Sequence, residues 1–176
     1  MSNQKTRKPH ERELYEPIRE YLAKFFTQKF GNCFLEITAE GVFSSTLKSV
    51  VRHDIIFYFL RKKAPDLAGF IARKQSEWVA SSVPSIVQDY ITVEIKKDKI
   101  TLEDIYQAKM YGDLFQAKYA LLISPERIPE EIKRLDQNTY VTRRYMSGWY
   151  VHVGYWISTG NWMEQNWLPR SPFEDS

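Results

Sequence analysis

The sequence predicts an α/β protein with a central mixed β-sheet and helices on both of its faces. Runs with helical spacing alternate along the 176-residue chain with short runs rich in β-branched and aromatic residues. In the middle of the chain a strand-like run, a helical run and a second strand-like run follow one another, as in a right-handed crossover between parallel strands. We therefore expect one sheet of about four to six strands.

A long helix is expected first, after a basic tail at residues 1–10 that we expect to be flexible. Apolar residues recur at three- and four-residue spacing from Glu11 onward. Pro17 lies in this run and marks its start or a kink, because proline cannot donate a hydrogen bond to the previous turn. Gly31 is a suitable residue to end the helix.

Strands are expected in the next part of the chain. Residues 90–96 alternate β-branched residues with others and form the clearest strand in the sequence. Residues 73–88 fit the strand pattern poorly, so we expect a loop or a short helix there. Three further strands are predicted at residues 33–38, 55–60 and 67–72.

The second half of the chain begins with a predicted helix over residues 101–115. Thr101 can cap this helix, and Asp104 completes a capping box. The continuous apolar run at residues 119–124 is typical of a strand that is buried on both faces, and it should pair in parallel with residues 90–96. The remaining expected elements are a short charged helix at residues 129–135, a hairpin over 140–157 that turns near Ser147-Gly148, and an irregular C-terminus.

Composition narrows the class of protein. Hydrophobic residues make up 43% of the chain and charged residues 27%, which excludes a disordered or fibrous protein. No apolar run approaches the ~18 residues of a membrane span, and the charged N-terminus does not resemble a signal peptide. The single cysteine, Cys33, cannot form an internal disulfide, so we expect a cytoplasmic protein that does not contact membranes. The net charge of +3 permits nucleic acid as a partner without requiring it.

A carboxylate and a lysine share one face of the strand predicted at residues 90–96. Side chains alternate across a strand, so Val93 and Ile95 should face the core while Glu94 and Lys96 lie about 7 Å apart on the other face. Taken alone, such a pair is typical of an exposed strand and contributes little to stability. Its significance depends on the residues that accompany it.

Other residues of interest lie before and after this pair. Asp66 follows Pro65 at the start of a predicted strand, where an aspartate is often part of a turn. Gln107 and Tyr111 lie four residues apart and share a helix face, which is also the arrangement of residues that simply pack. Glu11 lies at the start of the first helix, where a solvated helix face is the ordinary explanation.

Together these motifs resemble those of the PD-(D/E)XK nuclease superfamily. Pro65-Asp66 corresponds to the PD element, Glu94-Ile95-Lys96 to the (D/E)XK element, and Gln107 with Tyr111 to the QxxxY element of its exonuclease branch. The opening Glu11-Arg12-Glu13-Leu14 resembles the first helix of archaeal Holliday-junction resolvases. The resemblance covers residues 11–124, and it implies a restriction-endonuclease-like core in a single domain at residues 11–176.

The resemblance implies a metal-dependent nuclease that hydrolyses phosphodiester bonds in DNA. Mg²⁺, for which Mn²⁺ can substitute, would be bound by oxygen ligands, as hard cations prefer. Lys96 would orient the attacking water or offset charge on the phosphate. The implied metal ligands are Asp66, Glu94, the Ile95 backbone carbonyl and Glu11, and the implied substrate-binding residues are Gln107 and Tyr111.

The identity of two of these acids stays open. Glu13, Glu16 and Glu20 are rivals of Glu11, because the helix phase near Pro17 is not settled by the sequence. The interval between Asp66 and Glu94 is long for a simple hairpin, which we attribute to an insertion at residues 73–88. Asp54 is the fallback for Asp66, and Asp89 is a poorer one.

The function also has alternatives. The enzyme could be a structure-selective endonuclease or a restriction-like or repair nuclease, and a homodimer would supply two sites for cutting both strands. The alternative function is a catalytically inactive nucleic-acid-binding module with the same fold. If the motif match is accidental, Glu94 and Lys96 should lie on an exposed strand, remote from Asp66.

Overall fold

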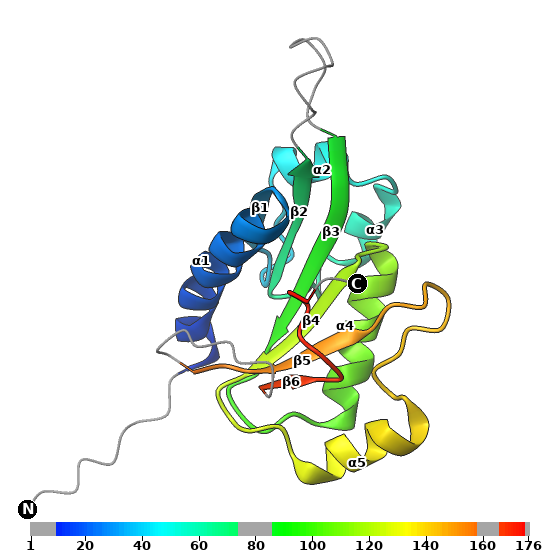
Figure 1. Cartoon of the computed structure of the whole chain (residues 1–176). Helices are drawn as coiled ribbons and strands as arrows, with labels where there is room; N and C mark the ends of the chain where they lie inside the picture. The colour runs from blue at the N-terminus through cyan, green and yellow to red at the C-terminus, as the bar shows by residue number, and fades with distance from the viewer. Residues whose placement is uncertain (1–9, 74–85, 158–165, 175–176) are drawn as a thin grey trace, which may run out of the picture.

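Six strands among the described residues form one mixed, open sheet in the order β1-β2-β3-β4-β5-β6 (Figure 1). The computed structural model describes residues 10–73, 86–157 and 166–174. The first three strands pair antiparallel, β3, β4 and β5 pair in parallel, and β6 is antiparallel to β5. The strands are β1 Asn32–Ile37, β2 Leu67–Arg73, β3 Ile86–Ile95, β4 Tyr119–Ser124, β5 Val151–Tyr155 and β6 Trp167–Leu168.

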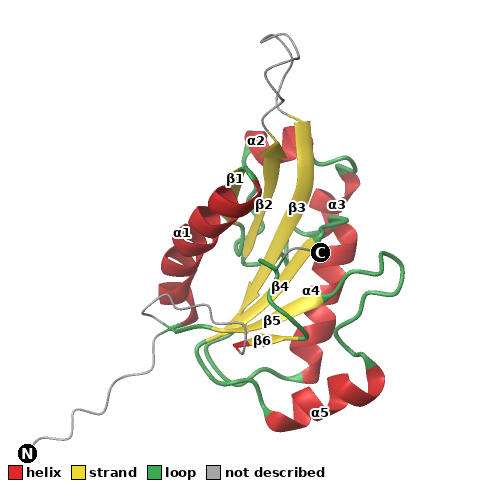
Figure 2. Cartoon of the chain, viewed as in Figure 1, coloured by secondary structure: helices red, strands yellow, loops and turns green. Residues whose placement is uncertain are grey.

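Helices cover both faces of the sheet, as the sequence predicts (Figure 2). One face packs against α1, and the other packs against α4 together with two short helices, α2 and α3. No helix in the described part of the chain is long and apolar enough to cross a membrane. The helices are α1 Glu11–Phe30, α2 Ser45–Val50, α3 Ile55–Phe59, α4 Leu102–Leu114 and α5 Glu130–Thr139.

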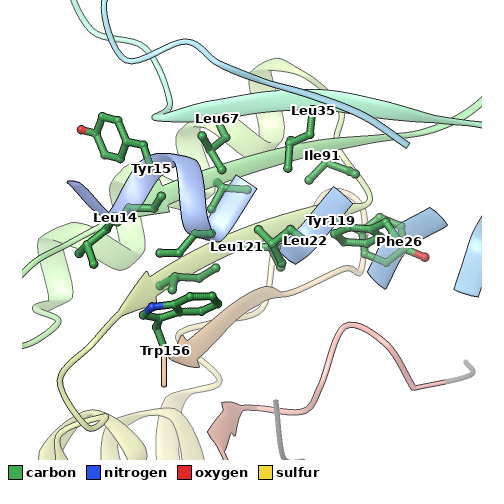
Figure 3. Packing of buried hydrophobic residues seen from close by; sticks show 14 of the residues in the cluster. Leu14, Tyr15, Leu22, Phe26, Leu35, Leu67, Ile91, Tyr119, Leu121 and Trp156 are labelled. Atoms are coloured by element: carbon green, nitrogen blue, oxygen red, sulfur yellow. The ribbon is translucent and has the colours of Figure 1, made fainter. Parts of the chain in front are cut away.

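The central strand β4 shows why both faces must be covered. All six of its residues are buried, which confirms the prediction for residues 119–124. Tyr119 and Leu121 pack with Leu22 and Phe26 of α1 (Figure 3), and the Phe26 and Tyr119 rings lie 4.9 Å apart. Residues of the opposite parity in β4, such as Leu122, pack toward α4 instead. The alternation of a strand therefore supplies both layers of the core.

The first helix follows the predicted spacing and begins at Glu11, so Pro17 lies inside it and not at its start. His10 is the residue before the helix, and residues 1–9 of the predicted tail lie outside the described residues. Leu14, Ile18 and their successors at helical spacing are buried against the sheet. This burial places the first turn of α1 beside the start of β2 and the end of β3.

The strand predicted at residues 55–60 is wrong, because these residues form α3 and the turn after it. A short apolar run has no period that separates a strand from a helix. In the structure Ile56 and Leu60 are buried four residues apart, whereas Tyr58 and Phe59 are exposed. The insertion expected at residues 73–88 also needs correction: β2 reaches Arg73 and β3 begins at Ile86, and residues 74–85 lie outside the described residues.

The predicted hairpin over residues 140–157 is confirmed only beside its turn. β5 pairs in parallel with β4, and the expected antiparallel pairing is limited to one bridge between Arg143 and Tyr150. The turn itself is present, since the Gly148 N–H donates to the Arg144 carbonyl and Gly148 has a φ of 75°. The Val151 N–H also donates to the Thr142 carbonyl at 2.8 Å, so the segment before the turn lies along one edge of β5 and β4 lies along the other.

Candidate active site

All six side chains that the sequence analysis selected line one open pocket of about 660 Å³. The pocket lies where β3 ends and β2 begins, between the first turn of α1 and the middle of α4. Four separate elements therefore contribute to it, and they span most of the chain. The six residues are Glu11, Asp66, Glu94, Lys96, Gln107 and Tyr111.

Asp66 directly precedes β2 and is held by hydrogen bonds from the β1 side and the β3 side. The last paired residues of β2 and β3 are Leu67 and Val93, so Asp66 lies opposite Glu94 one step further along. Its Oδ2 accepts the Ile95 N–H at 2.7 Å, and its own carbonyl accepts the Thr38 N–H from the β1 side at 2.8 Å. The carboxylate is therefore buried and fixed in position.

The Ile95 backbone carbonyl points toward Asp66. The Lys96 N–H donates to the Ile123 carbonyl of β4 at 2.9 Å. In a trans peptide the C=O and N–H point in opposite directions, so the Ile95 carbonyl points away from β4 and toward β2. The Ile95 carbonyl and the Asp66 carboxylate thus lie on the same side of β3.

Glu94 and Lys96 form a pair in which the acid is buried and the lysine half-buried, unlike the exposed pair that the local sequence alone would suggest. Glu94 is 4% exposed. Its Oε1 accepts hydrogen bonds from Lys96 Nζ at 2.9 Å and from Gln107 Nε2 at 2.7 Å. Its Oε2 is buried and accepts no hydrogen bond from the described part of the chain. A buried carboxylate oxygen in this state is costly unless a ligand satisfies it.

The helix α4 holds the other side of this pair. Gln107 Nε2 lies 3.4 Å from the hydroxyl of Tyr111, whose ring is almost completely buried. Lys96 Nζ lies 3.5 Å from Asp104 Oδ1, while Asp104 Oδ2 accepts the Thr101 N–H. The capping box that starts α4 therefore also positions the lysine, a connection that the sequence pattern does not reveal.

Glu11 is the acid of α1 that reaches the pocket. Of the four candidate acids, all in the described part of the chain, Glu11 alone lines it. Glu13 instead accepts the His10 N–H at 2.9 Å, Glu16 pairs with Arg19, and Glu20 is exposed.

The buried Tyr15 connects Glu11 to the acids of the sheet. Its hydroxyl donates to Glu11 Oε1 at 3.4 Å, and it also interacts with the Asp66 carboxylate. Sequence reasoning missed Tyr15, although its position four residues after Glu11 places both on one helix face.

The fallback acids lie elsewhere. Asp54 precedes α3 and lines a different pocket. Asp89 lies near the other end of β3, with its Oδ2 3.8 Å from Lys118 Nζ. Their positions leave Asp66 as the acid opposite Glu94.

Burial disfavours the ionised forms of both Asp66 and Glu94. Burial raises the pKa of Glu94 to about 7, with a further contribution from the charge of Asp66, although Lys96 opposes both effects. Burial also raises the pKa of Asp66, against the effect of the Ile95 N–H. Burial alone would lower the pKa of Lys96, but the hydrogen bond and charge of Glu94 raise it overall. A cation would stabilise this cluster of acids.

The oxygen-rich cluster suits a hard divalent cation. Among the described residues, no three His, Cys, Asp or Glu side chains form a metal centre by themselves. Mg²⁺ does not need such a group, because it keeps several water ligands and is commonly held by one or two carboxylates. Asp66 and Glu94 match this requirement, since Glu94 Oε2 has no hydrogen-bond partner among the described residues, and Glu11 lines the same pocket.

Replacing Glu94 by glutamine is expected to stabilise the protein in the absence of divalent cations. The pKa of Glu94 rises from its usual 4.5 to about 7 on folding, so its favourable contribution is complete below pH 4.5 and is lost as the pH rises through 7. The glutamine variant does not lose this contribution, because its side chain does not ionise. The free energy of unfolding of the variant, relative to the wild type, should increase by about 1–3 kcal/mol between pH 4.5 and pH 8.

Urea unfolding in EDTA at both pH values measures this difference. Glu103→Gln, which removes an exposed acid from α4, is the matched control and should show no such increase. A Glu94→Gln difference that is the same at both pH values would contradict the buried, destabilised carboxylate.

Cations also surround the pocket. Lys62 and Lys63 precede the start of β2 and line the pocket, together with Lys97 and Arg12. The sequence analysis did not assign them to the site, although the basic run of residues 61–63 is visible in the sequence. A rim of cations around buried acids fits a substrate with negative charge on either side of its reacting bond.

Comparisons of the chain with models of known protein families, with curated proteins and with solved structures found no match.

Proposed function

We propose that the protein is a divalent-cation-dependent nuclease with a restriction-endonuclease-like core, and that it hydrolyses phosphodiester bonds in DNA. The observation that carries the proposal is that the buried acids Asp66 and Glu94 and the half-buried Lys96 line one open pocket, where Glu94 Oε2 has no hydrogen-bond partner among the described residues. This arrangement costs stability, and a bound cation would offset that cost. Such a cost is common at functional sites and rare elsewhere.

Asp66 and Glu94 would hold the cation, and Glu11 and the Ile95 carbonyl would complete its surroundings. When bound there, a divalent cation would lower the pKa of a water molecule and stabilise negative charge on a leaving oxygen. The two carboxylates are pre-organised for this role, because the Ile95 N–H fixes Asp66 and the Gln107 amide fixes Glu94.

Lys96 would act on the reacting phosphate. Its ammonium group is held by Glu94 and Asp104 at the floor of the pocket, and its side chain is 22% exposed. A positive charge at a fixed position stabilises the extra negative charge of the transition state without reorganising during the reaction. Gln107 holds Glu94, and Tyr111 braces Gln107, so we assign both to positioning as well as to substrate contact.

The rim cations would bind phosphates next to the reacting one. Lys62, Lys63 and Lys97 each line the pocket. Contacts of this kind fix the position of the backbone and carry no sequence information. This supports a nucleic acid backbone as substrate over a small phosphate ester, which has no neighbouring phosphates to contact.

A panel of end-labelled DNAs incubated with Mg²⁺ tests the proposal. Linear duplex, single strand, flap and four-way junction are compared, and a circular single strand separates endonuclease from exonuclease action. We expect at least one substrate to be cleaved by the wild type and none by Asp66→Asn. DNA binding without cleavage of any substrate, with Mn²⁺ as well as Mg²⁺, would contradict the proposal and favour the inactive binding module.

A further inference from the structure

The short helix α3 presents large apolar side chains to solvent. Ile55, Tyr58 and Phe59 are 62%, 63% and 68% exposed. The buried side of the same helix, Ile56 and Leu60, packs into the core beside the C-terminal end of α4 (Figure 1). The helix is therefore firmly attached by one side, and its exposed side is not needed for folding.

The exposed rings form one cluster with an arginine. The centres of the Tyr58 and Phe59 rings lie 5.2 Å apart with an angle of 86° between the planes. The Arg61 guanidinium carbon lies 5.4 Å from the centre of the Tyr58 ring. This combination of aromatic faces and a guanidinium is suited to stacking on flat, electron-rich groups such as nucleobases.

The cluster borders a hollow next to the candidate active site. Ile55, Tyr58, Arg61 and Lys48 line an open pocket of about 560 Å³. Gly41 also lines it and packs closely on the backbone of Leu60 and Arg61.

Residues that line the two pockets are neighbours in the sequence. Ala39 lines the active-site pocket two residues before Gly41, and Lys62 and Lys63 line it directly after Arg61. The segment of residues 61–63 therefore contributes to both pockets.

The surface is also strongly basic. Residues 48–63 contain the cations Lys48, Arg52, Arg61, Lys62 and Lys63 and a single acid, Asp54. A second copy of the chain docked through the same surface would bring these cations against themselves, as two-fold symmetric association requires. An anionic polymer with exposed flat groups matches both the charge and the rings.

We propose that α3 and residues 61–63 form a stacking platform that binds single-stranded DNA and directs it into the active-site pocket. This inference rests on the proposed nuclease function and specifies its substrate. Bases of a single strand expose their faces to Tyr58 and Phe59, whereas bases inside a duplex already stack on one another. Arg61, Lys62 and Lys63 would contact the phosphates between the stacked bases and the reacting bond.

The test measures binding in EDTA, where cleavage is prevented. Fluorescence anisotropy of labelled oligo(dT) and of a labelled blunt hairpin duplex gives the two Kd values. The double variant Tyr58→Ala/Phe59→Ala should bind oligo(dT) about tenfold to a hundredfold more weakly and bind the duplex with little change. Tyr58→Trp/Phe59→Trp should retain binding of the single strand, because tryptophan also stacks.

Tyr145→Ala is the matched control. Tyr145 is 72% exposed, and Arg143 lies 5.9 Å from its ring centre, but it lines neither pocket. It should bind oligo(dT) like the wild type. Unchanged oligo(dT) binding by the alanine double variant would overturn the platform. Equal losses of single-strand and duplex binding would also overturn it. So would a change in the oligomeric state of the protein in solution when both rings are removed.

The platform and the nuclease function fail in different ways. If the double variant loses single-strand binding but the wild type cleaves no DNA with any divalent cation, the platform stands and the nuclease proposal fails. If the wild type cleaves DNA and the double variant binds oligo(dT) normally, the platform fails and the nuclease proposal stands.

Discussion

Replacing Lys96 by alanine should lower the rate of DNA cleavage by about a hundredfold to a thousandfold, the range seen when one fixed electrostatic group is removed from a transition state. The Lys96 ammonium group lies 2.9 Å from Glu94 and 3.5 Å from Asp104. These contacts fix the position of the positive charge in the pocket. A mobile cation from the solvent would have to be ordered before it could take the same position.

Single-turnover cleavage of the preferred substrate measures the loss, and binding in EDTA should change little. Lys99→Ala is the matched control, since Lys99 is exposed three residues further along and lies outside the pocket lining. Circular dichroism establishes that both variants are folded. Full activity of Lys96→Ala would remove the lysine from the mechanism.

Removing divalent cations should abolish cleavage, and restoring Mg²⁺ should both restore it and stabilise the fold. Two buried carboxylates with raised pKa values repel each other when both are ionised, and a bound cation relieves this repulsion. At a concentration one hundred times Kd, a ligand that binds only the folded state stabilises it by about 2.7 kcal/mol. For a chain of this size that corresponds to a rise of about 5–10 °C in Tm.

Thermal unfolding with and without Mg²⁺ separates binding from catalysis. Asp66→Asn and Glu94→Gln should lose the rise in Tm, and Glu11→Gln should reduce it. Glu13→Gln is the control on the same helix turn, because Glu13 accepts the His10 N–H and lies outside the pocket lining. Undiminished cleavage in excess EDTA would exclude a cation-dependent mechanism.

The core of the sheet was predictable because its signal is local. Residues 119–124 are continuously apolar, and such a strand has to be buried on both faces, as β4 is. The run at residues 55–60 is equally apolar but forms α3. The run is too short for its periodicity to distinguish a helix from a strand. The contact of Ile56 and Leu60 with the core decides in favour of the helix.

The hairpin expected near the C-terminus is confirmed only beside its turn. A tight turn at Gly148 predicts that the segments on either side pair with each other. In the structure Val151 and Val153 pair with β4, a segment far away in the sequence. A strand has two edges, and the Val151 N–H donates to the Thr142 carbonyl along the edge that does not pair with β4. The pairing with β4 is a property of the assembled sheet, which the turn does not reveal.

The sequence by itself determined which residue types the chain offers to a site: an acid before β2, an acid and a lysine on β3, and the Gln107 and Tyr111 pair on α4. Only the tertiary structure decided that they meet, that Glu11 joins them in place of Glu13, and that Glu94 Oε2 is buried with no hydrogen-bond partner in the described part of the chain. The physical reason is that residue order records spacing along one element, whereas burial and charge are set by the neighbours that packing brings from other elements.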